Sequence, residues 1–385
     1  MKAFACAWKR WEDDLKRLLA CLLAALAAGC GGSSGPSPAS LPSIPDPQQV
    51  RVLWNADIGT AEHFNLVPAL AGDSIYSVAR DGRIVRFDAA SGREIWRTYA
   101  DMRVSGGVGA DTGTVVVASE AGEVAAFDAA NGKLRWRSRV SSEVLSPPAV
   151  GRGLVLVRSI DNRIFAFGAQ DGKRRWVYQR PATSLVVRTP AGAVIREDTA
   201  YAGFRGGKLA AIALSNGGLR WEATVAQAKG TTELERVIDV VGDPAVQGLE
   251  VCATAYQGRL ACFDAATGAQ VWARDVSSVT GVSLDARYAF VSDDKGAVQA
   301  FDRTTGREVW KQDKLSLRQL SLPLPAGNAI AVGDFEGYVH FLARDTGAFL
   351  ARYRARGGGV RAAPILLPSG MLVQTHSGGL HALSL

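Results

Sequence analysis

Short apolar segments that suit β-strands alternate with glycine-containing turns along most of the chain. The clearest pair of strands is Ile84–Phe87 and Glu94–Arg97, on either side of a turn at Gly92. Gly82 lies ten residues before Gly92, so two tight turns bracket one strand, and glycine suits such turns because it adopts positive φ readily. Further strands fit upstream, for example from Gly113 to Ser119. Four strands in about 40 residues is the size of one propeller blade.

A ten-residue segment around the second turn recurs seven times. Six copies end in tryptophan and the seventh has alanine there: Trp96, Trp136, Trp176, Trp221, Trp272, Trp310 and Ala351. A four-stranded sheet has two apolar faces, and stacking the sheets around a ring buries each face on its neighbour. A recurring tryptophan supplies each contact with a large apolar surface. We therefore interpret these tryptophans as packing residues and not as ligand contacts.

The two ends of the chain together supply an eighth unit. Residues 377–385 contain one more turn and a third strand, whereas Arg51–Trp54 is a fourth strand with no blade before it. Trp54 precedes Trp96 by one repeat length. The pattern predicts an all-β fold, an eight-bladed β-propeller of four-stranded antiparallel blades over residues 49–385. The N-terminal strand pairs with the C-terminal blade, which closes the ring and leaves no long open edge.

The N-terminal residues indicate targeting and not folding. Lys16 and Arg17 precede an apolar run, residues 18–28, which is too short to span a bilayer as a helix. Small residues then lead to Cys30, which resembles a bacterial lipoprotein signal with Cys30 as the acylated mature N-terminus. We predict a signal peptide at residues 1–29 and an acylated, flexible tether at 30–48. The alternative is an ordinary secretory signal that leaves Cys30 a free thiol.

Charge and composition argue against a nucleic-acid partner. The chain has 44 basic and 37 acidic side chains, a formal charge of +7. No run of lysine or arginine forms the clustered patch that a phosphate backbone requires. A mildly basic, solvated surface is the simpler interpretation.

The sequence contains no recognisable catalytic, metal or cofactor motif. The four histidines, His63, His340, His376 and His381, form no metal-binding pattern, and we interpret His340 and His381 as buried strand residues. Cys252 and Cys262 flank the turn at Gly258 on adjacent strands. They form either a cross-strand disulfide or two buried thiols. We therefore predict no catalytic residues, no metal and no cofactor.

Two long connections between blades are the candidate binding site. The tryptophan spacing is near 40 residues except for 45 before Trp221 and 51 before Trp272. Inter-blade connections share one rim of a propeller, so the two insertions should lie side by side, and long loops on a rigid scaffold often carry function. Apolar and charged residues there suit a protein partner: Leu185, Val187, Arg188, Glu233, Arg236 and Asp239. The alternative is a pair of loops that fold back on their own blades.

Three segments are distinctive beside the repeats and the missing seventh tryptophan: GTTELERVIDVVGDPAV, GDFEGYVHFLARDTG and LVQTHSGGLHALSL. The repeats resemble those of pyrroloquinoline-quinone-type propellers, and with these segments the whole chain resembles the BamB family of outer-membrane protein assembly lipoproteins. The resemblance implies a non-catalytic scaffold, lipid-anchored to the periplasmic face of the outer membrane. Its two loops would contact a periplasmic domain of the barrel-inserting protein BamA, and a second acidic residue of that contact is replaced here by Val241. Binding of unfolded barrel precursors is a further hypothesis.

Two other functions stay open on the sequence alone. One is a quinone-dependent dehydrogenase, because that superfamily shares the repeat. The other is a propeller that binds envelope glycans. Fold resemblance does not by itself decide between them.

Overall fold

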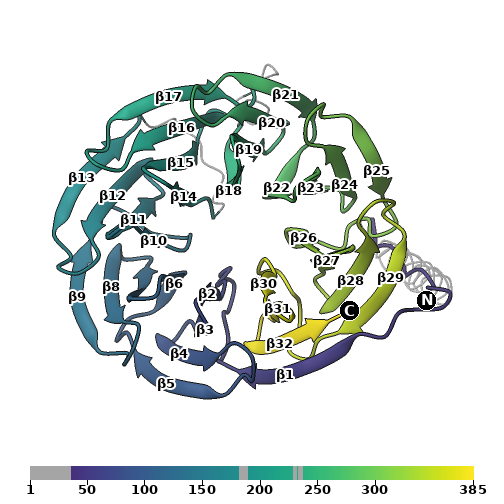
Figure 1. Ribbon diagram of the computed structural model, residues 1–385, viewed down its shortest axis with the longest axis horizontal. Helices are drawn as coiled ribbons and strands as arrows, with labels where there is room; N and C mark the ends of the chain where they lie inside the picture. Colours follow the sequence, from purple (N-terminus) through teal and green to yellow (C-terminus); the bar gives the residue numbers. More distant parts are fainter. Residues whose placement is uncertain (1–35, 182–189, 229–231, 233–236) are drawn as a thin grey trace, which may run out of the picture. The chain divides into compact units, whose positions relative to one another are not determined.

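The computed structural model describes residues 36–181, 190–228, 232 and 237–385. Ala39–Leu385 form one compact unit. The described residues of this unit contain 32 strands and no helix, arranged as eight four-stranded antiparallel sheets around a ring (Figure 1). The predicted eight-bladed propeller is confirmed.

Each of the first seven blades contains four consecutive strands. Blade 1 comprises β2 (Ala69–Ala71), β3 (Ser74–Val78), β4 (Arg83–Asp88) and β5 (Glu94–Tyr99), and blade 2 comprises β6 (Val104–Ala110), β7 (Thr114–Ser119), β8 (Glu123–Asp128) and β9 (Leu134–Arg139). Blade 3 comprises β10 (Ala149–Gly151), β11 (Leu154–Ser159), β12 (Arg163–Gly168) and β13 (Arg174–Gln179), and blade 4 comprises β14 (Ala193–Arg196), β15 (Thr199–Phe204), β16 (Lys208–Ala213) and β17 (Leu219–Thr224). Blades 5 to 7 comprise β18 (Val240–Gln247), β19 (Glu250–Ala255), β20 (Arg259–Asp264), β21 (Gln270–Asp275); β22 (Ser278–Leu284), β23 (Tyr288–Asp293), β24 (Val298–Asp302), β25 (Glu308–Gln312); and β26 (Leu324–Ala326), β27 (Ala329–Gly333), β28 (Tyr338–Ala343), β29 (Phe349–Arg354).

Blade 8 combines the two ends of the chain. It contains β30 (Ile365–Leu367), β31 (Gly370–Gln374) and β32 (Gly379–Ser384), and its outer strand is β1 (Arg51–Asp57). β1 pairs antiparallel with β32, with Trp54 opposite Ala382. The predicted closure of the ring by the N-terminal strand is therefore confirmed.

The antiparallel order gives the ring two different faces. Within a blade, the first strand is nearest the centre of the ring and the fourth is outermost. Because neighbouring strands are antiparallel, every fourth strand ends on the same face of the ring, where the chain crosses to the next blade. We call this the loop face. The turns between third and fourth strands, which contain the repeated motif, all lie on the opposite face.

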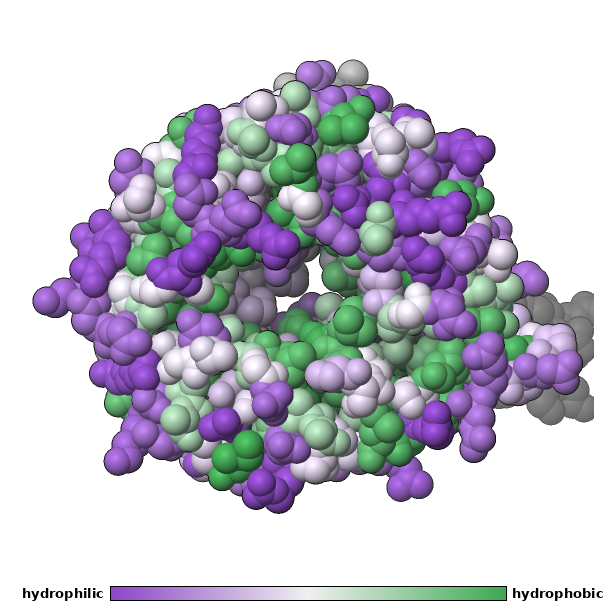
Figure 2. Space-filling view, viewed as in Figure 1, coloured by the Kyte–Doolittle hydropathy of each residue, from purple (hydrophilic) through white to green (hydrophobic). Residues whose placement is uncertain are grey.

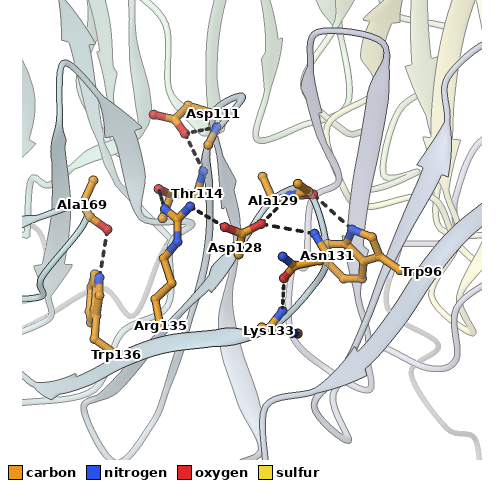
Figure 3. Close-up of polar contacts among 12 residues, drawn as sticks. Trp96, Asp111, Thr114, Asp128, Ala129, Asn131, Lys133, Arg135, Trp136 and Ala169 are labelled. Carbon is orange, nitrogen blue, oxygen red and sulfur yellow. Dashed lines mark hydrogen bonds and ion pairs between the residues drawn. The ribbon is translucent and has the colours of Figure 1, made fainter.

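Each repeated tryptophan packs on the motif turn of the following blade. The indole Nε1 of Trp96 donates a hydrogen bond to the backbone oxygen of Ala129 (3.0 Å), and Trp136 donates to Ala169 (2.9 Å; Figure 3). The same contact joins Trp54 to Ala89, Trp176 to Leu214, Trp221 to Ala265, Trp272 to Arg303 and Trp310 to Arg344. Since a buried indole N–H needs an acceptor, the bond fixes where each ring lies on the next blade.

Aspartate and glycine shape the turn that receives the indole. Asp128 Oδ1 accepts the backbone N–H of Ala130 (2.9 Å), and Oδ2 accepts from Arg135 Nη2 (2.6 Å; Figure 3). The hydrogen bond from Arg135 is the main reason that the pKa of Asp128 is lowered. Gly132 has φ +71°, and a Cβ there would lie 2.9 Å from Cε3 of Trp96. Glycine is required both by the backbone conformation and by the ring above it.

The seventh copy of the motif needs no tryptophan, because blade 8 has no motif turn. Its third and fourth strands, β32 and β1, are the two ends of the chain and are not joined. Ala351 is fully buried at this seam, where Val50 and Leu385 pack against the same apolar cluster. Alanine therefore occupies position 351 at the seam where no motif turn is present to receive an indole.

Part of the predicted tether is docked on blade 7. The sequence predicts a flexible segment from residue 30 to 48, but the Ala39 N–H donates to the Ser316 oxygen (2.9 Å) and the Gln48 N–H to the Leu350 oxygen (2.9 Å). Composition rich in proline and serine describes local conformational preference and carries no information about such contacts. We call residues 39–50 the strap.

A buried charged network underlies the strap. Arg318 Nε donates to Asp334 Oδ2 (2.7 Å), and its Nη2 bonds Glu336. His340 Nε2 lies 2.9 Å from the same Asp334 oxygen, while Arg352 Nε donates to His340 Nδ1 (3.2 Å). A ring that accepts at Nδ1 is neutral and carries its proton on Nε2. Burial favours this neutral form by lowering the pKa of His340.

We expect stability to fall as the pH drops below about 6.5, the ordinary pKa of histidine. His340 has the lower pKa in the folded state, so the unfolded chain binds more protons there and acid favours unfolding. Melting temperatures of the wild type and His340→Gln between pH 7.5 and 5 measure the effect. The variant should lose less stability, although His381, whose pKa burial also lowers, retains part of the slope. Equal slopes for both proteins would contradict this account.

Gly172→Ala should destabilise the ring more than Gly153→Ala. Both glycines have positive φ, +64° and +75°, so both variants strain the backbone by roughly 1 kcal/mol. Only at Gly172 would the added Cβ meet an indole, 2.6 Å from Cδ2 of Trp136, whereas no atom lies within 4 Å at Gly153. Overpacking should add about 1–3 kcal/mol. Urea denaturation compares the two, and equal losses would show that the indole contact is unimportant.

Candidate partner-binding site

The described ends of the two longest inter-blade connections lie next to each other on the loop face. One joins β13 to β14 and the other joins β17 to β18, on either side of blade 4. Most predicted partner-binding residues fall in segments outside the described residues: Leu185, Val187, Arg188, Glu233 and Arg236. The site is therefore defined here by the stems of the two connections.

The stem of the first connection is held by residues from blades 3 and 5. Arg158 Nη1 on β11 donates to the Ala191 oxygen (2.7 Å), and Asp243 Oδ1 on β18 accepts the Gly192 N–H (2.7 Å). The surrounding protein keeps water from Arg158 and lowers its pKa to about 10, so the guanidinium stays charged at neutral pH. Two charged side chains from different blades thus fix the backbone where the chain leaves the connection and enters blade 4.

Asp239 lies at the buried end of the second stem. Its relative exposure is 5%, and it forms an isolated β-bridge with Arg205. Its Oδ1 accepts the Gly206 N–H (3.4 Å), and its backbone oxygen accepts the Tyr256 N–H (2.9 Å). The structure shows Asp239 anchoring the connection to blades 4 and 5, and its role as a partner contact stays a prediction.

The two stems are directly linked. Asp243, which bonds the first stem at Gly192, lies four residues after Asp239 of the second stem. A shift of β18 would therefore move both stems together. This linkage is invisible in the sequence, because nothing marks Asp243 or Arg158 apart from other charged strand residues.

A polar groove of about 510 Å³ lies beside the second stem. Its lining comes from the end of β17, the turn between β19 and β20, and β21, and comprises Thr224, Val225, Ala226, Gln227, Gln257, Gly258, Arg259, Gln270 and Asp275. Arg259 Nε bonds Asp275 Oδ1 within it (2.8 Å). The loop face thus offers side-chain amides next to the candidate loops.

The centre of the ring contains a cavity of about 160 Å³ (Figure 2). Its lining is mainly proline, small and apolar residues from the inner strands and connections, and its charged members are Asp243 and Arg361. Among the described residues, no three histidine, cysteine or acidic side chains are grouped to hold a metal ion. The described part of the chain also has no helix long and apolar enough to cross a membrane.

The predicted cysteine pair is joined in a disulfide. Cys252 on β19 and Cys262 on β20 are paired in the strand register, and their Cα atoms are 4.1 Å apart. Both are fully buried in the apolar cluster between blades 5 and 6. Of the two alternatives that the sequence leaves open, the structure contains the bridge.

Comparison with known proteins identifies the family. The family model described as "Outer membrane protein assembly factor BamB" matches residues 43–98 and 80–312. The protein of that name from Bordetella pertussis is 45% identical over 344 residues, 89% of each chain. The Pseudomonas aeruginosa protein of the same name is 41% identical, over 95% of this chain and 97% of its own. The chain belongs to the BamB family.

Solved structures agree with this assignment. BamB from Moraxella catarrhalis is 25% identical, has a TM-score of 0.80 and is matched over 88% of this chain and 100% of its own. A quinohemoprotein alcohol dehydrogenase from Comamonas testosteroni has a TM-score of 0.66 at 14% identity, over 87% of this chain and 76% of its own. The second likeness concerns the fold alone. We therefore interpret the two stems as parts of a BamB-family propeller.

Asp243→Ala should loosen the first stem. The change removes the acceptor of the Gly192 N–H, and a hydrogen bond to a charged group contributes about 1.5–3 kcal/mol. Amide hydrogen exchange at Gly192 should accelerate by roughly tenfold or more. Asp293→Ala, which removes a carboxylate from a loop-face turn in blade 6, is the control and should leave Gly192 unchanged. Unaltered exchange in Asp243→Ala would rule out this bond as an anchor.

Proposed function

We propose that the protein is a non-catalytic scaffold of the machinery that inserts β-barrel proteins into the outer membrane. Cys30, acylated, anchors it to the periplasmic face, and the paired connections bind a periplasmic domain of the barrel-inserting protein. The supporting observation is the juxtaposition of the two stems on one face of a BamB-family propeller, linked by the bond from Gly192 to Asp243.

The candidate loops have the chemistry of a protein interface. Leu185 and Val187 would supply apolar contact beside Arg188, and Glu233 and Arg236 would supply directional ion pairs. Apolar residues next to arginine are typical of interface hot spots. Asp239 would act by positioning, because its carboxylate is buried at the base of the second connection.

The ring centre offers little for redox chemistry. A quinone that carries several carboxylates would need a cluster of cations and ligands for its metal, whereas the charged lining of the cavity among the described residues is Asp243 and Arg361. The relatives are named as assembly factors. Both points favour a binding role over the dehydrogenase alternative.

Arg188→Glu should abolish co-purification with the barrel-inserting protein. Reversal of charge at a central interface arginine removes its contacts and adds repulsion, which costs several kcal/mol, or more than 100-fold in affinity. A pull-down from solubilised envelope, with mass spectrometry of the captured proteins, measures the loss.

Arg174→Glu is the matched control, because it makes the same charge change on the exposed outer strand β13 of blade 3. It should retain the partner. Full capture by Arg188→Glu would contradict the proposed site, and capture of no membrane-protein partner by the wild type would contradict the proposed function.

A further inference from the structure

The strap crosses the outer edge of blade 7 from one face of the ring to the other. Its first residue, Ala39, bonds Ser316 in the connection between β25 and β26, which lies on the loop face. Nine residues later, Gln48 bonds Leu350, the second residue of β29. Because β29 ends on the loop face, Leu350 lies towards the opposite face. The strap therefore runs antiparallel to β29. Figure 1 shows it on the outer side of that strand.

Side chains as well as backbone groups hold the strap. Arg318 Nη1 donates to the Ala39 oxygen (3.0 Å), and Arg352 Nη2 donates to the Pro42 oxygen (2.9 Å). Leu41 and Ile44 are half-buried. Arg318 is only 3% exposed and is fixed by Asp334, which is fully buried. A buried arginine that is already neutralised and still has a free N–H is a strong, directed donor for a backbone carbonyl.

Without the strap, the N-terminal segment would leave the propeller on the opposite face. β1 is a fourth strand, so it ends on the loop face at Asp57 and begins on the opposite face at Arg51. With the strap docked, the most N-terminal residue held on the propeller is Ala39 instead of Arg51. These two residues are separated by the length of a six-residue strand. At about 3.3 Å per residue that separation is roughly 20 Å.

We propose that the strap turns the loop face of the propeller towards the membrane. The inference rests on the proposed anchor at Cys30. Ala39 is the ninth residue after Cys30, and the chain between the two spans at most about 30 Å when extended. The lipid anchor therefore holds the loop face near the bilayer at blade 7, on the same face as the two candidate partner-binding connections. A partner bound there is kept next to the membrane surface.

Energy transfer to a membrane acceptor measures this orientation. The full-length acylated protein is purified and reconstituted in vesicles of phosphatidylethanolamine and phosphatidylglycerol that contain a headgroup-labelled acceptor lipid. A donor is attached either at Arg356→Cys, in the connection after β29 on the loop face, or at Asn328→Cys, in the turn between β26 and β27 on the opposite face. Both positions are exposed and belong to blade 7. We expect the donor at 356 to lie closer to the headgroups by roughly 20 Å.

Releasing the strap should remove that difference. Ala39→Pro with Gln48→Pro deletes both strap N–H donors and leaves the propeller side chains intact. Ser40→Pro with Gln49→Pro is the matched control, because neither N–H has a hydrogen-bond partner among the described residues. The first pair should equalise or reverse the two transfer efficiencies, and the control pair should preserve the wild-type order. Arg352→Gln, which removes the donor to Pro42, should reduce the difference in the same direction.

The outcomes separate the orientation from the anchor. Equal transfer from the two sites in the wild type, or an unchanged difference in the Ala39→Pro, Gln48→Pro protein, overturns the role of the strap. A wild-type protein that does not float with vesicles overturns the lipid anchor at Cys30, and the orientation with it. Loss of partner capture by Arg188→Glu is independent of both and tests the proposed function alone.

Discussion

The contact between an indole and the next blade's turn is the interaction on which the ring depends. A tryptophan buries about 150–250 Å², equivalent to roughly 4–6 kcal/mol of apolar burial before entropy is counted. Its N–H bond to a turn carbonyl adds direction to that burial, so neighbouring blades meet in one orientation. Seven such contacts, from Trp54 to Trp310, follow each other around the ring. A blade alone would expose both apolar faces.

The eighth seam shows what the indole contact requires. Between blades 7 and 8 the receiving turn does not exist, because β32 and β1 belong to opposite ends of the chain. A tryptophan at residue 351 would have neither a turn carbonyl nor a motif glycine to lie on, and the site holds Ala351 with Val50 and Leu385 around it. Closure depends instead on the strand pairing of β1 with β32.

The sequence predicts the repeated parts of the fold, because the same local interactions recur in every repeat. The Asp–Gly turn and the tryptophan recur with fixed spacing, and blade number, register and ring closure follow from them. Prediction from the sequence fails for contacts that occur only once in the molecule. The strap is held by Arg318 and Arg352, which lie about 280 and 310 residues away in the chain, and its composition describes only an extended segment. The isolated bridge between Asp239 and Arg205 of a neighbouring blade is another contact of this kind.

The same repeated contact explains why binding features gather on one face. On the opposite face, each turn between third and fourth strands is fixed in length, because its carbonyl and glycine must meet an indole from the preceding blade. An insertion there would break a contact between blades. The connections on the loop face carry no such requirement, and the irregular spacings before Trp221 and Trp272 arise there. The stems of the candidate partner-binding connections, the polar groove beside them and the start of the strap all lie on that face, where the chain can vary without opening the ring.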